Sequence, residues 1–248
     1  MGLSAAMICK DSERSIQRAI VSTLDSVDEF IIVDTGSTDR TIEIIQGLAE
    51  QHDKIKLHHF AWTGDFAAAR NYSLSLVTHD WVFVMDSDDE LPESERKKLR
   101  LYCEHYEKQG VRAGMYIVCD NTVNGEITSS IDAIMRLFPS DLRYKDKIHE
   151  VVDTDGKDVV IVKSDIHILH DGYDPAVTDV YAKKQRNLEM MIEALKEDQT
   201  NARMWMQLGR EFIRIDDDKA RQFLDRAESL TQDKGLLRWI EDSRNSIK

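Results

Sequence analysis

A run of acidic residues directly after an apolar segment is the first feature of this sequence that could do chemistry. The segment 81–85 is apolar throughout and contains two valines, which predicts a strand buried on both faces. Four carboxylates follow it within five positions, at Asp86, Asp88, Asp89 and Glu90. Clustered carboxylates are costly to bury unless a cation lies among them. Oxygen ligands on a short loop are typical of Mg²⁺ or Mn²⁺ sites, where the ion commonly bridges to phosphate oxygens.

The same stretch has a second interpretation as the start of a helix. Pro92, Glu93 and Glu95 open a predicted helix over 93–108, and acidic side chains are favourable in the first turn of a helix. This interpretation accounts for Glu90, Glu93 and Glu95, but it does not require Asp86 or Asp88. Metal binding and helix capping therefore both remain open for the stretch as a whole.

The elements that would position these acids alternate along the first part of the chain. Strands are predicted over 3–9, 30–33 and 55–60, and each is followed by a helical segment, of which 66–74 is rich in alanine. Such alternation is typical of the α/β class, with a mixed, mostly parallel sheet and helices on both faces. The N-terminal apolar segment lacks a basic flank, so we interpret it as a strand and not as a signal peptide.

Polar residues follow each of the buried strands. Lys10 comes after the first strand, Asp34 after the second, and Asp86 after the segment 81–85. Ligands of open α/β sheets bind beyond the carboxyl ends of the strands, so these side chains are expected to share one crevice. No glycine-rich phosphate loop follows the first strand, which disfavours dinucleotide dehydrogenases and P-loop NTPases.

The middle third of the sequence predicts antiparallel pairing. Asn124-Gly125 separates the apolar segments 115–118 and 127–137, which is a strong hairpin signal. By the same reasoning, Asp155-Gly156 predicts a second hairpin, between residues 151–152 and 159–162. The sheet is therefore expected to carry a β-rich addition.

From about Pro175 onward the pattern is helical. Residues 205–212 match the opening of a tetratricopeptide repeat. We therefore predict a catalytic domain over 1–174 and a small α-helical extension over 175–248. One repeat cannot bury its own apolar face, so it must pack on the rest of the chain or on a second copy, which makes a homodimer through the extension a possible arrangement.

Composition and charge exclude several classes of function. The 248 residues carry a formal net charge of −13, which disfavours nucleic-acid binding by phosphate neutralisation. No apolar run approaches the roughly 20 residues of a membrane-spanning helix. The three cysteines, Cys9, Cys103 and Cys119, are odd in number and widely spaced. They predict reduced thiols in a cytoplasmic protein and not a disulfide frame or a zinc site. The expected location is the cytoplasm, which includes a peripheral position at the inner membrane face.

Several ordered segments of the chain resemble the inverting family 2 glycosyltransferases, which have the GT-A fold. These segments are 7–10, 33–41, 66–71 and 86–89, and the similarity extends over about residues 3–175. Within the family the chain looks most like lipopolysaccharide-core-type transferases and bacteriocin peptide S-glycosyltransferases, in which tetratricopeptide-like helices follow the catalytic domain.

The resemblance implies roles for residues on the donor side. Asp34 is expected to contact the nucleotide base, and Arg70 to lie near the base or the diphosphate. Asp86, the first acid of the DxD motif, is expected to meet the ribose or the metal, and Asp88 to ligate Mn²⁺ or Mg²⁺. The donor is a nucleotide sugar, with a UDP-sugar favoured. The nucleotide-sugar-binding residues expected on this basis are Lys10, Asp34, Gly36, Arg70, Asp86 and Ser87.

An inverting displacement also needs a general base that takes the proton from the acceptor. Glu150 is the first candidate, with His149 beside it, because His-Glu follows the strand where the family places acceptor-side residues. Asp89 is the second candidate. The alternative interpretation of Glu150 is a surface carboxylate, and both interpretations remain open.

Two histidines near residue 170 could also act at the site. His167 and His170 are three positions apart, so a regular strand places them on opposite faces and they are not expected to share one metal. His170 lies at the predicted strand end and is the better candidate for contact with the diphosphate or the metal. The other interpretation of His170 is a structural histidine.

The sequence thus predicts a metal-dependent inverting glycosyltransferase that moves a hexose-type sugar to a glycan, lipid-linked or peptide acceptor. One alternative is a nucleotidyltransferase on a related α/β scaffold, although no glycine-rich, arginine-containing loop follows the first strand. Another is a non-catalytic binding module that uses the helical extension for docking. The acid pair Asp86 and Asp88 argues against that module.

Overall fold

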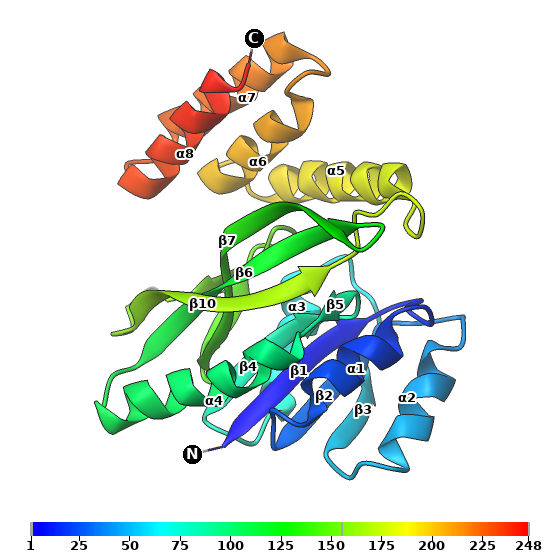
Figure 1. Ribbon diagram of the computed structural model, residues 1–248. Coiled ribbons are helices and arrows are strands. Elements are labelled where there is room, and N and C mark those ends of the chain that lie inside the picture. Colours follow the sequence, from blue (N-terminus) through cyan, green and yellow to red (C-terminus); the bar gives the residue numbers. More distant parts are fainter. Residues whose placement is uncertain (1, 155, 248) are drawn as a thin grey trace. The chain divides into compact units, whose positions relative to one another are not determined.

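The computed structural model describes residues 2–154 and 156–247, with the exception of the side chains at positions 132 and 133. These residues form two compact units (Figure 1). The first contains the residues up to Asp146 together with Glu150–Val180, and the second contains Lys147–His149 and the residues from Tyr181 onward. The domain boundary predicted from sequence, after residue 174, remains a prediction.

The first unit holds all the strands and the first four helices. The strands are β1 (Leu3–Cys9), β2 (Glu29–Asp34), β3 (Ile55–His59), β4 (Trp81–Asp86), β5 (Asp89–Glu90), β6 (Ala113–Val123), β7 (Glu126–Pro139), β8 (Arg143–Lys145), β9 (Val151–Asp153) and β10 (Val160–His170). The helices are α1 (Ile16–Leu24), α2 (Thr41–Ala49), α3 (Phe66–Leu76) and α4 (Glu93–Lys108). The predicted strands and helices of the first part of the chain are thereby confirmed.

The main sheet has the strand order β3-β2-β1-β4-β7-β6-β10-β5. Strands β3, β2, β1 and β4 are parallel to one another. The direction changes at β4, since β7 pairs with it in the antiparallel sense. Strand β10 is parallel to β6, and the short β5 is antiparallel to β10. The sheet is therefore mixed, as the sequence predicted.

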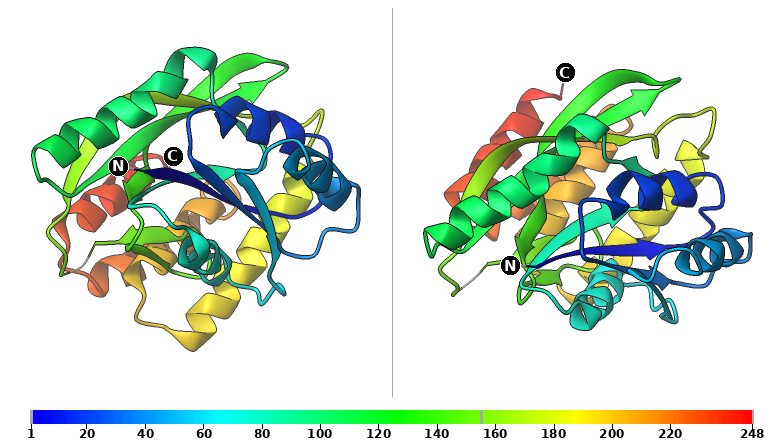
Figure 2. Two further views of the ribbon diagram at one scale, coloured as in Figure 1. Left: turned by 90° about the horizontal axis from the view of Figure 1, so that it is seen from below. Right: turned by 60° about the horizontal axis from the view of Figure 1, so that its bottom comes forward.

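Helices cover both faces of the sheet (Figures 1 and 2). Alternate residues of β1 enter a core with apolar side chains of α1, α2 and α4, and Met7 and Ile20 are fully buried there. The intervening residue Ala6 enters a second core with α3 and the 138–144 segment. This alternation follows from the two-residue period of a strand and explains why residues 5–9 of β1, 30–33 of β2 and 81–85 of β4 are apolar on both faces.

The β-rich addition agrees with one predicted hairpin and contradicts the other. Strands β6 and β7 pair in the antiparallel sense around Asn124-Gly125, and both turn residues have positive φ. Strand β9, however, pairs with β8 in a separate two-stranded sheet, while β10 pairs with β6. Asp155 lies outside the described residues. The second hairpin prediction was wrong because the turn signal at Gly156 marks a change of sheet, which local sequence does not distinguish from a hairpin.

The second unit consists mainly of four helices: α5 (Val180–Glu197), α6 (Ala202–Phe212), α7 (Asp217–Ser229) and α8 (Lys234–Asn245). Side chains of Asn201, Asp216 and Asp233 accept backbone N–H groups at the starts of the last three, as N-caps do. Gly209 lets α6 approach α7, since a Cβ there would lie 2.9 Å from Leu224 Cγ. The assignment of these helices to a tetratricopeptide-like repeat remains a prediction.

Among the described residues, no helix is both long enough and apolar enough to span a membrane.

Candidate active site

The carboxyl ends of β2, β1 and β4 lie side by side. Cys9 is in register with Asp34, and Ile8 with Asp86, so the polar residues that follow these strands meet at one edge of the sheet. The Oγ atoms of Ser12 and Ser87 are 2.8 Å apart and join the loops after β1 and β4. The edge that the sequence predicted as a shared crevice is therefore formed by the expected strand ends.

Asp34 organises the loop after β2. Its carboxylate is buried and accepts the backbone N–H groups of Gly36 at 2.9 Å and Ser37 at 3.1 Å. Gly36 has φ of +110°, a conformation that side chains with a Cβ rarely adopt, so glycine is required by the turn. His59 Nδ1 lies 3.6 Å from the same carboxylate. The loop is thus held in a fixed shape beside the end of β1.

Asp86 lies between two buried arginines. Its Oδ1 accepts from Arg70 Nη2 at 2.7 Å, and its Oδ2 accepts from Arg136 Nη2 at 2.6 Å. Burial alone would raise the pKa of Asp86, but the guanidinium groups of Arg136 and Arg70 hold that pKa well below its usual value. Asp86 is therefore a fixed negative charge at the end of β4.

Arg136 was missed by the sequence analysis. It lies on β7 between apolar residues, its side chain is 7% exposed, and its Nη1 is 3.6 Å from Asp89 Oδ2. A signal for it was present, because an arginine within a buried strand must meet an opposite charge. The pairing of β7 with β4, which brings Arg136 to Asp86, could not be inferred from local sequence.

Asp89 is fully buried and joins three parts of the chain. Its Oδ2 accepts the backbone N–H of Asp86 at 2.8 Å, and its Oδ1 lies 2.9 Å from His170 Nδ1. The pairing of β5 with β10 places Asp89 and His170 opposite each other. Burial lowers the pKa of His170, but the hydrogen bond to Asp89 and the nearby charge of Asp88 raise it overall.

Oxygen and nitrogen ligand atoms of Asp86, Asp88, Asp89 and His170 lie within 4.8 Å of one another. Three carboxylates and an imidazole form a donor set that fits Mn²⁺ or Mg²⁺. Gly172 lies against the same group, since a Cβ at that position would overlap Asp88 Oδ2 and His170 Nε2. The missing side chain leaves room beside the ligand atoms, so the residues fit a bound divalent cation.

His167 points away from this cluster. Residues 166, 168 and 170 of β10 are buried, whereas His167 is exposed and its Nδ1 lies 2.8 Å from Asp120 Oδ2. The two histidines therefore lie on opposite faces of β10, as the spacing predicted.

The two candidate bases are placed differently. Glu150 Oε1 accepts from Arg70 Nε at 2.6 Å, so Arg70 joins Glu150 to Asp86, and the Glu150 side chain is 14% exposed. Asp89 is wholly buried among partners. His149 has φ of +52° and belongs to the second compact unit, where its carbonyl accepts from Arg203 Nη2.

A second arginine pair lies beside the cluster and was also missed. Arg14 donates to both carboxylate oxygens of Asp171, at 2.7 and 2.9 Å, and Arg18 Nη2 donates to Asp171 Oδ2 at 2.8 Å. The Asp171 N–H in turn points to the Asp88 carbonyl at 3.4 Å. These contacts fix the segment that follows β10 against the acidic loop after β4.

The chain is similar to several known proteins. It is 34% identical over 153 residues to a TPR repeat-containing protein of Synechococcus elongatus. The aligned residues make up 61% of this chain and 35% of that protein. It is 22% identical over 220 residues to the glycosyltransferase SunS of Bacillus subtilis, covering 88% of this chain and 50% of SunS. The lipopolysaccharide core biosynthesis glycosyltransferase LpsC of Rhizobium meliloti is 32% identical over 97 residues, or 39% of this chain and 35% of LpsC.

Solved structures support the GT-A fold. A crystal structure of S. aureus TarS 1–349 matches with a TM-score of 0.52 and 14% identity, over 98% of this chain and 88% of that one. The same protein in complex with UDP-GlcNAc matches with a TM-score of 0.54 and 12% identity, over the same shares of the two chains.

The chain spans between 35% and 50% of the length of these three curated relatives. The family model for glycosyl transferase family 2 matches residues 4–165, which is more than half of the chain. The sheet, the strand-end acids and this match together establish that the chain belongs to glycosyl transferase family 2.

Proposed function

We propose that the protein is a metal-dependent inverting glycosyltransferase that transfers a hexose-type sugar from a UDP-sugar to a glycan, lipid-linked or peptide acceptor. The observation that carries the proposal is the convergence of Asp86, Asp88 and His170 beside the Asp34 loop at the carboxyl ends of parallel strands. Ligands of such sheets bind at that edge. The family membership supplies the reaction class.

The choice of a UDP-sugar rests on the structural neighbour, because TarS is described in complex with UDP-GlcNAc and with UDP. On this chain, Asp34 and the Gly36 turn would receive the base, with Lys10 and Ser87 at the neighbouring strand ends. Arg70 has a buried Nη1 that no hydrogen-bond acceptor in the described part of the chain reaches. We assign this donor to a diphosphate oxygen of the bound nucleotide.

Asp88, Asp86 and His170 would hold Mn²⁺ or Mg²⁺. A bound divalent cation supplies charge stabilisation for the departing nucleoside diphosphate. Arg136 and Arg70 keep Asp86 ionised, and Asp89 keeps His170 in place through its Nδ1. The protein thus orients its ligand atoms with a layer of buried hydrogen bonds, as metal sites generally do.

Glu150 is the general base in this proposal. Asp89 is engaged by Asp86 N–H and by His170, whereas Glu150 retains one carboxylate oxygen beyond its bond to Arg70 Nε. A carboxylate that removes the acceptor proton during attack at the anomeric carbon completes a direct displacement with inversion. We assign His149 no chemical role. We propose that its backbone conformation, with φ of +52°, orients the Glu150 residue that follows it.

The test is calorimetric binding of UDP with and without Mn²⁺. We expect binding that requires the metal and is lost in Asp88→Asn, while circular dichroism shows an unchanged fold. Asp141→Asn removes a carboxylate that is 57% exposed and pairs with Arg112 at the surface, so this control should bind like the wild type. Metal-independent binding, or no binding of any nucleoside diphosphate, would refute the proposal. A screen of UDP-, GDP- and dTDP-sugars for hydrolysis then identifies the donor.

The location and assembly of the protein are part of the same proposal. All three cysteines are free and buried, which suits a reducing compartment, so we place the enzyme in the cytoplasm. The helical unit is its proposed contact to a second copy or to the acceptor. Size-exclusion chromatography with light scattering, on the full chain and at several concentrations, tests the homodimer.

A further inference from the structure

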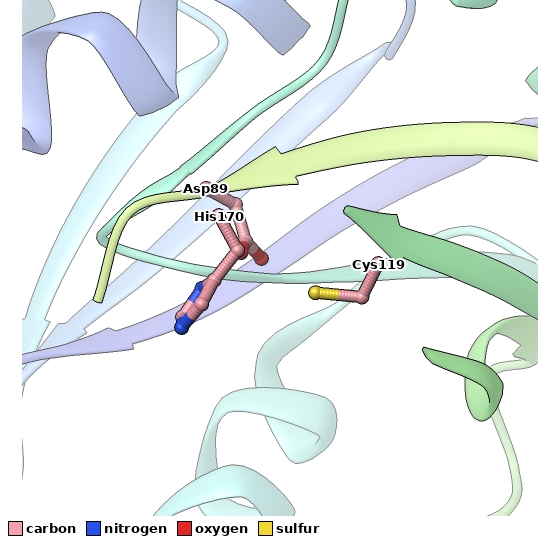
Figure 3. Close-up of side chains that lie close together, drawn as sticks. All are labelled: Asp89, Cys119 and His170. Carbon is pink, nitrogen blue, oxygen red and sulfur yellow. The ribbon is translucent and has the colours of Figure 1, made fainter. Parts of the chain in front are cut away.

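A second group of possible ligands lies on the inner side of the cluster, and it has a different chemistry. Asp89, Cys119 and His170 are all buried, and one ligand atom of each lies within 4.8 Å of the others. Figure 3 shows the Cys119 sulfur directed toward the Asp89 and His170 side chains. The group combines sulfur, oxygen and nitrogen from three strands, β6, β5 and β10.

The position of Cys119 follows from the sheet. Cys119 is in register with Ile168 on β10, two residues before His170, and faces the same core as Ile168. A strand places residues two apart on the same face, so Cys119 and His170 share one side of the sheet. The β5–β10 pairing then adds Asp89 opposite His170. These contacts are made by backbone ladders, which hold the three side chains near one another.

A sulfur ligand changes which metal a site prefers. Mn²⁺ and Mg²⁺ favour oxygen ligands, whereas Zn²⁺ takes thiolate, imidazole and carboxylate at tetrahedral sites with a fourth position open. The affinity of a mixed nitrogen, oxygen and sulfur site for divalent ions is lowest for Mn²⁺, increases through Co²⁺ to Cu²⁺, and is lower again for Zn²⁺. We therefore expect this group to bind Zn²⁺ more tightly than Mn²⁺. We propose that Asp89, Cys119 and His170 form a site for Zn²⁺, distinct from the oxygen-rich site at Asp86 and Asp88.

The two groups share Asp89 and His170, so Zn²⁺ on one group competes for ligands with a cation on the other. The Nδ1 atom of His170 lies 2.9 Å from Asp89 Oδ1 and 3.5 Å from Asp88 Oδ1, so the same ring nitrogen faces both groups. Zn²⁺ on the inner group therefore withdraws His170 from the outer group. Occupation is balanced by release of the Cys119 thiol proton and of the proton held between His170 and Asp89. The consequence that Zn²⁺ inhibits transfer rests on the proposed function, whereas the binding itself does not.

Cobalt spectroscopy on the metal-stripped chain tests the binding. Co²⁺ on a thiolate gives a sulfur-to-metal charge-transfer band in the near ultraviolet, and we expect one equivalent of Co²⁺ to produce it and Zn²⁺ to remove it. Cys119→Ser and Cys119→Ala should both lose the band. Cys103→Ser and Cys9→Ser are matched controls, since each removes a buried thiol outside the group, and both should keep it. Circular dichroism checks that each variant is folded.

A titration of Mn²⁺ by electron paramagnetic resonance tests the sharing of His170. Saturating Zn²⁺ should weaken Mn²⁺ binding at least about tenfold in the wild type. Loss of the contacts that hold a metal ligand in place typically lowers metal affinity by a factor of this size. In Cys119→Ala the same Zn²⁺ concentration should weaken it much less. The proposal is overturned by a missing cobalt band in the folded wild type, by a band that survives in both Cys119 variants, or by simultaneous binding of Zn²⁺ and Mn²⁺. None of these outcomes depends on glycosyltransferase activity.

Discussion

Arg136 Nη2 donates to Asp86 Oδ2 at 2.6 Å, and this ion pair joins the antiparallel part of the sheet to its parallel part. The Arg136 side chain is buried at 7% exposed, and the Asp86 side chain is 26% exposed. A buried pair need not stabilise the fold more than apolar side chains would, but removal of one partner leaves an uncompensated charge. The stability of the β4–β7 pairing therefore depends on the charge of Asp86, which is also a residue of the candidate site.

Arg136→Met is expected to destabilise the first unit strongly. Removing one partner of a buried ion pair costs about 3–5 kcal/mol of unfolding free energy. Arg112→Met is the control, because Arg112 pairs with Asp141 at the surface, and exposed pairs contribute about 0–1 kcal/mol. Urea unfolding followed by circular dichroism measures both variants. Equal effects of the two substitutions would contradict the assignment of Arg136 as a buried counter-charge.

Asp171 is expected to make stability depend on pH in the acidic range. Burial raises its pKa, but the hydrogen bonds from Arg14 and Arg18 lower it to about 2, below the ordinary value of 3.8. A depressed folded-state pKa contributes stability that is complete above about pH 4 and is lost as pH falls toward 2. Urea unfolding over the acidic range should therefore show a steeper loss for the wild type than for Asp171→Asn. Parallel curves for the two proteins would argue against this contribution.

Gly172→Ala is expected to weaken Mn²⁺ binding. The new Cβ would overlap Asp88 Oδ2 and His170 Nε2, so the ligand atoms must separate to accommodate it. We expect at least about a tenfold loss of metal affinity by calorimetry, the scale associated with disturbed ligand positions. Gly47→Ala is the matched control, because a Cβ at that helical position meets nothing within 4 Å. That control should bind Mn²⁺ normally and gain about 0.5–1 kcal/mol in stability.

Glu150→Gln is expected to separate catalysis from donor binding. The amide keeps the size of the side chain but cannot accept a proton, so kcat should fall about 10²- to 10⁴-fold. UDP affinity in the presence of Mn²⁺ should stay near the wild-type value. Asp89→Asn should show the opposite pattern, with weaker metal binding, because Asp89 holds His170. A full loss of UDP binding in folded Glu150→Gln would contradict the assignment of Glu150 as the general base and would indicate that Glu150 helps to bind the nucleotide donor.

Much of the parallel half of the site could be predicted from sequence. Buried strands are recognisable as apolar runs, and their carboxyl ends are where ligands of α/β sheets bind, so the residue pattern alone predicts that Asp34 and Asp86 lie together. The register that sets Ile8 beside Asp86 confirms this prediction. The histidine spacing on β10 likewise required only the two-residue period of a strand.

The antiparallel half could not be predicted in the same way. Arg136 reaches Asp86 across 50 positions, and Arg14 reaches Asp171 across 157, so neither contact leaves a local pattern. The turn at Gly156 shows the same limit, since β8 and not β10 became the partner of β9. Pairing between distant strands is decided by the packing of whole faces, and single-sequence patterns describe only one strand at a time.

The two-residue strand β5 has a consequence for the order in which the site forms during synthesis. Its partner on β10 includes His170, which leaves the ribosome 81 residues after Asp89. Contacts between residues far apart in sequence form slowly, because closing the loop between them costs conformational entropy before the contact contributes any stabilisation. The parallel strands β1 to β4 are complete by residue 86, so they are synthesised before His170 can close the acidic loop. Metal binding would then mark the moment at which the first unit is complete.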